Sequence, residues 1–125
     1  MSDPKKILIA EDNDIEAMII ERSLKSAGYQ VFRASDGLEA LEKYLTQQKF
    51  DLLITDVMMP KLGGLELVWH AKEKNCLPPT IVLTANATDE ASLKSLQLGA
   101  VDHLVKPINI ALILAKVQIV LRKAS

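Results

Sequence analysis

Four short apolar runs in the chain each end in polar residues that are suited to phosphate or metal chemistry. The runs span residues 7–10, 52–55, 81–83 and 104–105, and the residues after them are Glu11 and Asp12, Asp56, Thr84, and Lys106. In an open parallel sheet with helices on its faces, ligands bind beyond the carboxyl ends of the strands. If the runs are neighbouring strands, these side chains converge on one cleft that suits a divalent cation and a phosphoryl group.

Length and composition narrow the class of protein. The 125 residues favour one domain over residues 1–125, and the formal net charge of −1 gives no indication of nucleic acid or a membrane surface as a partner. No apolar stretch reaches the roughly 18 uncharged residues of a membrane span, and the N-terminus has no signal-peptide pattern. The single cysteine, Cys76, excludes an internal disulfide, so we expect a cytoplasmic protein without direct nucleic-acid or membrane contacts.

Strand-like and helix-like patterns alternate along the whole chain. Apolar runs predict strands at residues 5–10, 30–34, 52–55, 80–85 and 103–105. Between them we expect helices over residues 14–27, 38–45 with Asp36 as its cap, 64–75, from Thr88 or Asp89 to Gly99, and 108–123. Alternation with such short connections is typical of a parallel sheet covered by helices on both faces.

Further residues at the ends of these runs carry a family resemblance. Residues 56–60 read Asp-Val-Met-Met-Pro, Gly64 follows at a turn, Ala85 follows Thr84, residues 99–102 lead into the last strand, and Lys106 precedes Pro107. Together with Glu11 and Asp12, and in this order, they resemble the receiver domain of two-component response regulators over essentially the whole chain. The resemblance implies an α/β fold of the flavodoxin-like, CheY-like type: one doubly wound five-stranded parallel sheet, in the order 2-1-3-4-5, with five helices.

Asp56 is the residue that we expect to accept a phosphoryl group, because a carboxylate can attack phosphorus and form an acyl phosphate. Carboxylates about 4 Å apart repel one another by about 4 kcal/mol at an effective dielectric constant of about 20, and a divalent cation relieves that repulsion. The resemblance implies Mg²⁺, with Mn²⁺ as the alternative ion. Its ligands would be Asp12, Asp56 and the backbone carbonyl of Met58, with Glu11 acting mostly through water.

Thr84 and Lys106 resemble the pair that senses the phosphoryl group in receivers. The hydroxyl would donate to one phosphoryl oxygen, and the ammonium would pair with another and with Asp56. The resemblance also implies a switch in which Thr84 moves together with a residue of the last strand, usually Tyr or Phe. Here that residue is His103, which is smaller and polar.

Two positions are expected to tune dephosphorylation. Met58 and Asn86 lie two residues beyond Asp56 and Thr84, where the residues of receivers flank the path of the hydrolytic water. Met58 is apolar and cannot orient water, whereas Asn86 can. The resemblance further implies a cis peptide bond between Lys106 and the proline after it.

The predicted function is that of a phosphorylation switch. The resemblance implies that a sensor histidine kinase or a histidine phosphotransfer protein donates the phosphoryl group to Asp56, and that the acyl phosphate shifts an equilibrium between two conformations. The output surface is expected on the fourth helix, fifth strand and fifth helix, acting on a downstream protein or on an output domain absent from this sequence. Beyond its own phosphorylation and dephosphorylation the chain is not expected to be an enzyme.

Several alternatives stay open. The chain is either a stand-alone receiver or the receiver module of a larger regulator or a hybrid histidine kinase. Remote alternatives are a flavin carrier, against which the acidic residues after the first strand argue, and an aspartyl phosphatase, which usually has a second Asp where Met58 stands. The last helix is apolar beyond one face, which indicates either a homodimer or partner contact or an aliphatic-rich core helix.

Overall fold

The sheet is built from five runs of apolar and β-branched residues. The computed structural model describes residues 3–85 and 90–124, and there the runs form β1 (Lys6–Ala10), β2 (Gln30–Ala34), β3 (Leu52–Asp56), β4 (Thr80–Thr84) and β5 (Asp102–Val105). Neighbouring strands pair in parallel in the order β2-β1-β3-β4-β5, which confirms the predicted order. Every residue of β3 and β4 is buried, as expected of strands covered on both faces.

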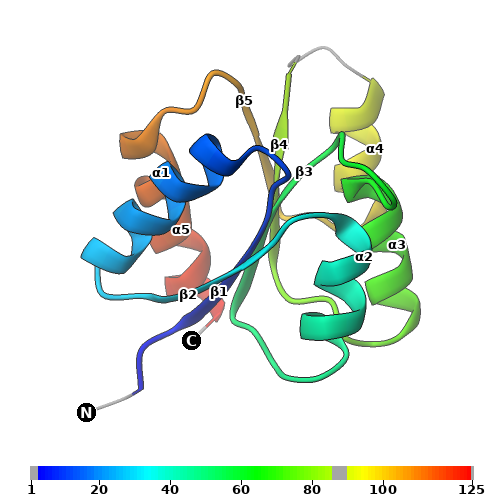
Figure 1. The fold of residues 1–125 in the computed structure, drawn as a ribbon, viewed down its shortest axis with the longest axis horizontal. Helices are drawn as coiled ribbons and strands as arrows, with labels where there is room; N and C mark the ends of the chain where they lie inside the picture. Colours follow the sequence, from blue (N-terminus) through cyan, green and yellow to red (C-terminus); the bar gives the residue numbers. More distant parts are fainter. Residues whose placement is uncertain (1–2, 86–89, 125) are drawn as a thin grey trace.

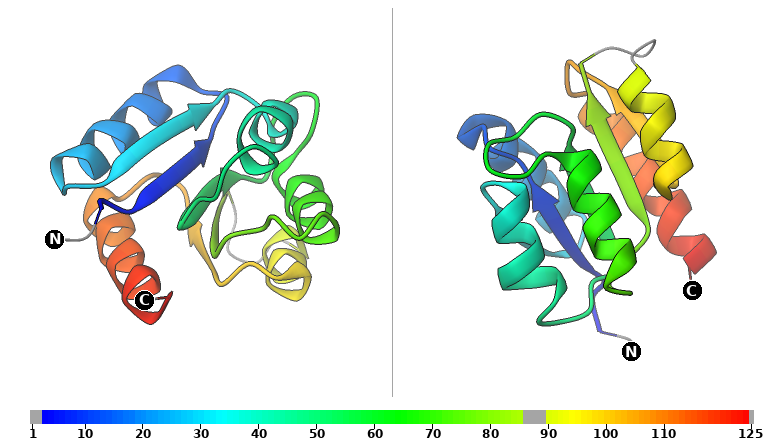
Figure 2. Two further views of the ribbon diagram at one scale, coloured as in Figure 1. Left: turned by 90° about the horizontal axis from the view of Figure 1, so that it is seen from below. Right: turned by 90° about the vertical axis from the view of Figure 1, so that its right-hand side faces the viewer.

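Helices cover both faces of this sheet (Figure 1). The helical segments are α1 (Asp14–Ser26), α2 (Gly37–Glu39), η1 (Ala40–Leu45), α3 (Gly64–Glu73), α4 (Glu90–Leu98) and α5 (Ile110–Ala124). α1 and α5 lie on one face, and α2, α3 and α4 lie on the other (Figure 2). Alternate residues of one strand therefore enter different cores: Ile7 and Ile9 pack with α1 and α5, whereas Leu8 packs on the opposite side.

The second predicted helix forms over the predicted residues, but its second half has a different pitch. Asp36 caps its start as predicted, accepting a hydrogen bond from the backbone N–H of Glu39 at 2.8 Å. The helix then widens into a π-helix, η1, and the N–H of Thr46 bonds to the carbonyl of Leu41. The ring of Tyr44 in this segment packs against Phe32 and Phe50, which lie on β2 and just before β3. The apolar spacing of residues 38–45 thus marks a buried helical face without specifying its pitch.

Most of the apolar side chains of the last helix, α5, are buried or partly buried against the core of this domain. The helix begins at Ile110 rather than at the predicted residue 108. One face is buried in the core, and further apolar residues at its edges pack partly against that core. Leu112 and Ile119 stay exposed, at 44% and 49%. The remaining apolar surface on α5 is therefore small. None of the helices in the described ranges is both long and apolar enough to cross a membrane.

Candidate functional site

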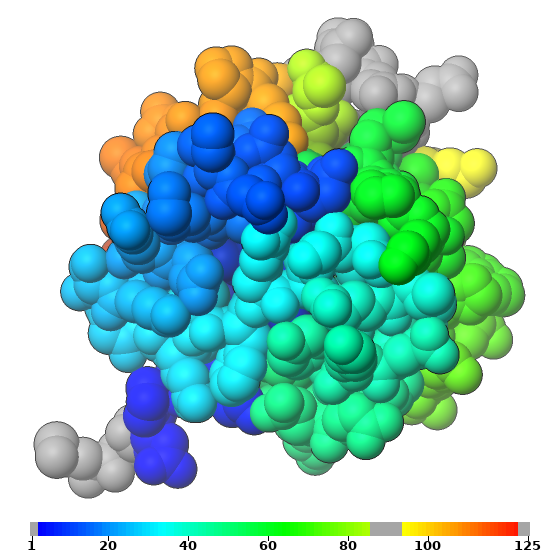
Figure 3. All heavy atoms as spheres, viewed as in Figure 1, coloured from blue at the N-terminus to red at the C-terminus, as the bar shows by residue number. Residues whose placement is uncertain are grey.

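Backbone hydrogen bonds between neighbouring strands continue for one residue beyond the strand ends and fix the polar residues there. The backbone N–H of Glu11 donates to the carbonyl of Ala34 at 3.1 Å, and that of Lys106 donates to the carbonyl of Thr84 at 2.7 Å. The N–H of Val57, next to Asp56, reaches β4 in the same way. The segments after β1, β3 and β5 consequently meet at one end of the molecule, visible as adjoining blue, green and orange surfaces in Figure 3.

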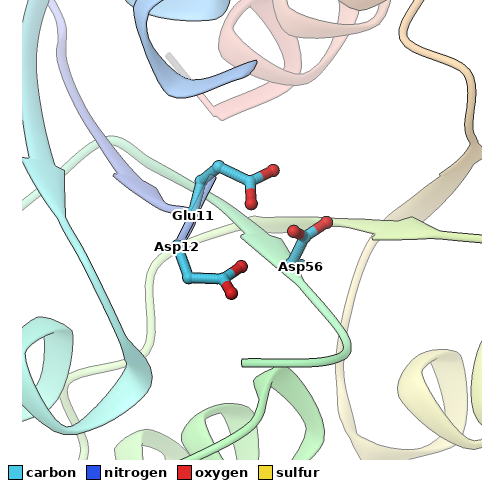
Figure 4. Close-up of side chains that lie close together, drawn as sticks. All are labelled: Glu11, Asp12 and Asp56. Carbon is cyan, nitrogen blue, oxygen red and sulfur yellow. The ribbon is translucent and has the colours of Figure 1, made fainter. Parts of the chain in front are cut away.

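Three carboxylates gather at this end of the sheet. One oxygen each from Glu11, Asp12 and Asp56 lies within 4.8 Å of the other two. Glu11 and Asp56 are 0% and 4% exposed, whereas Asp12 is open to solvent. Figure 4 shows the three carboxylate groups turned toward a shared space between them. The predicted acidic residues are thus brought together, although they come from two strands that are far apart in the sequence.

Lys106 places its ammonium group beside the acidic cluster. Its Nζ lies 2.9 and 3.0 Å from the two carboxylate oxygens of Asp56 and 3.5 Å from Oε1 of Glu11. It also donates a hydrogen bond of 2.9 Å to Glu16. Burial alone would lower the pKa of Lys106, but the hydrogen bonds to Glu16 and Asp56 outweigh it and hold that pKa above its ordinary value. The peptide bond from Lys106 to Pro107 is cis.

Glu11 is the most strongly perturbed acid of the cluster. Burial, and then the nearby carboxylate of Asp56, raise its pKa from an ordinary 4.5 to about 9. The N–H of Asn13 donates to its Oε2 at 3.1 Å, which favours the ionised form but does not offset the burial. In the absence of a cation, burial beside Asp56 therefore favours the protonated form of Glu11.

The cluster has the chemistry of a site for a hard divalent cation. Oε1 of Glu11 and Oδ1 of Asp56 are buried, and within the described residues neither accepts a hydrogen bond of acceptable geometry, even though Lys106 is near. Buried carboxylate oxygens without hydrogen bonds are costly unless a positive charge compensates them. Oxygen donors of this kind are the ligands that Mg²⁺ prefers. The residues present therefore fit the predicted ion.

A small hollow adjoins the carboxylate of Asp56. It has a volume of about 90 Å³, and its lining residues are Asp56, Val57, Met58, Leu83, Thr84, Ala85 and Lys106. Thr84 is buried, at 2% exposed, whereas the side chain of Met58 is 82% exposed. A space of this size holds a few waters or one small anion. The predicted acceptor, hydroxyl and ammonium thus border one space.

A larger hollow of about 450 Å³ lies at the opposite end of the sheet, between residues 45–50 and 75–78. These segments precede β3 and β4, so the hollow borders the amino ends of those strands. Ligands of open α/β sheets bind at the carboxyl ends. The candidate functional site is therefore the smaller space beside Asp56.

His103 and Asn86 were the remaining sequence predictions. His103 lies on β5 opposite Val82, on the same face of the sheet as Thr84. Its ring is partly buried, and Nδ1 has no hydrogen-bond partner among the residues that the structure describes. Asn86 falls outside the described residues, as do Thr88 and Asp89, the two predicted caps of α4.

Two residues at the site were missed by reasoning from the sequence. Glu16 lies in the first turn of α1, where an acidic residue is explained by the helix dipole alone, yet its carboxylate reaches Lys106. Arg33 on β2 donates hydrogen bonds of 2.8 and 3.2 Å to the carbonyl of Glu11 and pairs with Asp14 at 2.8 Å. Both contacts join residues far apart in the sequence, so no local pattern announces them.

Comparison with known proteins agrees with this geometry. The family model of the response regulator receiver domain matches residues 7–118. The chain belongs to this family. The receiver domain is also 37% identical over 120 residues to the alkaline phosphatase synthesis transcriptional regulatory protein PhoP of Bacillus subtilis (strain 168), a match that covers 96% of this chain and 50% of PhoP.

Two further matches show the range of proteins that carry this domain. Sensor protein EvgS of Escherichia coli (strain K12) is 41% identical over 104 residues, 83% of this chain but only 9% of EvgS. The receiver domain of Francisella response regulator 1452 superimposes with a TM-score of 0.90 at 30% identity, covering 97% of this chain and 99% of that one. This receiver domain thus spans half or less of the longer relatives PhoP and EvgS.

Proposed function

We propose that this receiver domain is a phosphorylation switch with Asp56 as the phosphoacceptor. The observation that supports the proposal is the position of Asp56, a buried carboxylate at the end of β3 between two other carboxylates and a lysine, with a small hollow beside it. The acidic surroundings oppose a flavin phosphate, which argues against the flavin-carrier alternative. An aspartyl phosphatase usually has a second carboxylate where this domain has Met58, which argues against the phosphatase alternative.

The chemistry proposed for Asp56 is an in-line displacement. A carboxylate oxygen of Asp56 forms a bond to phosphorus as the bond between phosphorus and the donor breaks, and the electron pair of that bond leaves with the donor. With a phosphohistidine donor, the imidazole leaves. Lys106, already within 3.0 Å of the carboxylate, would pair with the phosphoryl oxygens, and the hydroxyl of Thr84 would donate to another of them.

Asp12, Asp56 and the backbone carbonyl of Met58 would hold Mg²⁺, or Mn²⁺ in its place, with Glu11 acting mostly through water. A bound divalent cation would supply positive charge against the negative charge of the donor and of the transition state. Among the residues that the structure describes, Oε1 of Glu11 and Oδ1 of Asp56 are buried and accept no hydrogen bond, so both oxygens stay available to a cation.

We propose that phosphorylation of Asp56 changes the conformation of the edge strand β5 through Thr84. Thr84 ends β4, and His103 lies on the neighbouring strand and the same face, so a shift of the Thr84 hydroxyl toward a phosphoryl group alters the packing around the imidazole. The switch would thereby change the surface formed by α4, β5 and α5. We propose His103 as the partner of Thr84 in this movement, in place of the usual Tyr or Phe.

Met58 and Asn86 are proposed to set the rate at which the acyl phosphate is lost. The side chain of Met58 lies largely in solvent beside the hollow and offers no polar group to a hydrolytic water. Asn86 would supply the only polar side chain of this pair.

The partners follow from the family. We propose that residues 1–125 act as one cytoplasmic receiver domain that is phosphorylated by a sensor histidine kinase or a histidine phosphotransfer protein. The output acts on a downstream protein or on an output domain, as in regulators and sensor proteins longer than this chain. The exposed Leu112 and Ile119 on α5 are the residues through which a homodimer would form.

Beryllofluoride, which mimics a phosphoryl group, tests the switch by hydrogen exchange. With Mg²⁺ and beryllofluoride we expect the amide protection of β5 and α5 to change, because β5 pairs with the strand that Thr84 ends and Lys106 lies between β5 and α5. β2 lies at the other edge of the sheet and is expected to stay unchanged. Asp56→Asn is the control: it should not bind beryllofluoride, and its amide protection in β5 and α5 should not change. Binding of beryllofluoride without any change in β5 or α5 would contradict the proposed switch.

A further inference from the structure

The ammonium of Lys106 has more carboxylates around it than the proposed phosphoryl chemistry needs. Its Nζ carries three hydrogens and lies 2.9 Å from oxygens of Asp56 and Glu16, whereas Glu11 lies farther away, at 3.5 Å. Asp56 and Glu11 belong to the acidic cluster that surrounds the acceptor. Glu16 does not: it approaches from α1, and it is absent from the group of carboxylates close enough to share a metal ion among the described residues.

Glu16 is held in this position by the start of its own helix. The side chain of Asn13 caps α1 by accepting a hydrogen bond of 3.0 Å from the backbone N–H of Glu16. This fixes the first turn of α1, and the Glu16 carboxylate then spans the gap to the segment after β5, 90 positions away in the sequence. The side chains of Glu16 and Lys106 are only 30% and 24% exposed, so solvent screens their attraction incompletely.

We propose that Glu16 is a positioning residue that restrains Lys106 in the unphosphorylated domain and competes with the phosphoryl group for its ammonium. The inference rests on the proposed function, and it adds a residue of α1 to the machinery that sets affinity for a phosphoryl group. The competition has a simple geometric basis. A phosphoryl group on Asp56 adds oxygen acceptors beside Nζ, and the ammonium must turn toward them while Glu16 holds one of its three hydrogens.

The expected size of the effect follows from the strength of an ion pair that is still partly open to solvent. An exposed ion pair is worth up to about 1 kcal/mol, and a change of that size alters a binding constant about five-fold. Removing the Glu16 carboxylate should therefore tighten the binding of a phosphoryl mimic by about five-fold, because Lys106 no longer exchanges one anion for another.

Three variants separate the ion pair from the general effect of a negative charge. Glu16→Gln removes the charge. Glu16→Asp keeps the charge but shortens the side chain by one bond of about 1.5 Å, so that its carboxylate no longer reaches Nζ. Glu21→Gln is the matched control: Glu21 also lies on α1, is 29% exposed and pairs with a lysine at 2.9 Å, but that lysine is Lys25.

The experiment is a calorimetric titration of each protein with beryllofluoride at saturating MgCl₂. The proposal predicts that Glu16→Gln and Glu16→Asp both bind about five-fold more tightly than the unchanged domain, and that Glu21→Gln does not. Tighter binding by Glu16→Gln but not by Glu16→Asp would overturn it, because charge alone would then explain the effect. Equal affinities in all the proteins, or tightening by Glu21→Gln to the same extent, would also overturn it. If the unchanged domain takes up no beryllofluoride, the proposed function fails and this inference fails with it.

Discussion

In a buffer without divalent cations, the free energy of unfolding of the receiver domain is expected to fall as the pH rises from about 5 to 9, by about 1.4 kcal/mol per pH unit at most. The cause is Glu11, whose pKa is about 9 in the folded domain against an ordinary value of 4.5. Between these two values the folded domain holds a proton that the unfolded chain has lost. Because the unfolded chain binds fewer protons, each rise in pH favours unfolding.

Mg²⁺ is expected to reverse this loss. A ligand that binds only the folded state stabilises it, and carboxylates must lose their protons to bind a metal ion. The stabilisation by MgCl₂ should therefore be larger at the alkaline end of this interval. Chemical denaturation across the interval, with and without MgCl₂, measures both effects.

Other groups with shifted pKa values act outside this interval. The pKa of Asp102 lies below its ordinary 3.8, since the hydrogen bonds from Lys116 and His103 outweigh the opposing effect of burial. The pKa values of Cys76 and Lys106 lie above 9.0 and 10.5. Glu11→Gln is therefore the control and should flatten the pH dependence. Equal pH dependence in Glu11→Gln and the unchanged domain would contradict the role given to Glu11.

Gly64→Ala is expected to destabilise the domain by about 2 kcal/mol and to displace Asp56. A Cβ atom at this position would overlap the carbonyl oxygen of Asp56, and it would lie 2.9 Å from the carbonyl carbon of Asp56 and 3.2 Å from Cα of Val57. All of these are backbone atoms, so no side-chain rotation relieves the overlap. The N–H of Gly64 also donates to the carbonyl of Val57 at 2.9 Å, which ties the start of α3 to the turn after β3.

The neighbouring glycine provides a matched control. A Cβ at Gly63 would first meet a carboxylate oxygen of Glu66, which a side-chain rotation can move, and then the carbonyl oxygen of Val57 at 2.9 Å. Gly63→Ala should therefore be less destabilising than Gly64→Ala. Thermal denaturation of both variants, with the stabilisation by MgCl₂ as a second readout, compares them. Gly64→Ala protein with unchanged stability and an unchanged response to Mg²⁺ would contradict the tight contact described here.

The sequence predicts the sheet more completely than the helices around it. The central strands are continuous apolar runs, so their existence could be anticipated from the pattern, whereas their order was implied by the family resemblance. Only the strand ends moved: β4 stops at Thr84 rather than at residue 85, and β5 begins at Asp102. The π-helix η1 could not be anticipated. Tyr44 in this segment contacts Phe32 and Phe50, which lie outside the helix. The spacing of apolar residues within 38–45 carries no information about these contacts.

The acidic cluster was predictable because its members lie at or just after the ends of strands, and parallel strands bring their carboxyl ends to one edge of the sheet. The environment of Lys106 was not. Glu16 belongs to a helix, and its contact with Lys106 depends on how α1 packs over the sheet. The strong perturbation of Glu11 was also hidden, since it arises from burial that only the assembled fold creates.

Intact-protein mass after incubation with acetyl phosphate and Mg²⁺ tests the central claim most directly. We expect the addition of one phosphoryl group, and no addition when Mg²⁺ is removed or in Asp56→Ala. A mass gain that persists in Asp56→Ala or without Mg²⁺ would contradict it. So would the absence of any gain in a domain that also fails to bind beryllofluoride, because a short-lived acyl phosphate would still leave that complex stable.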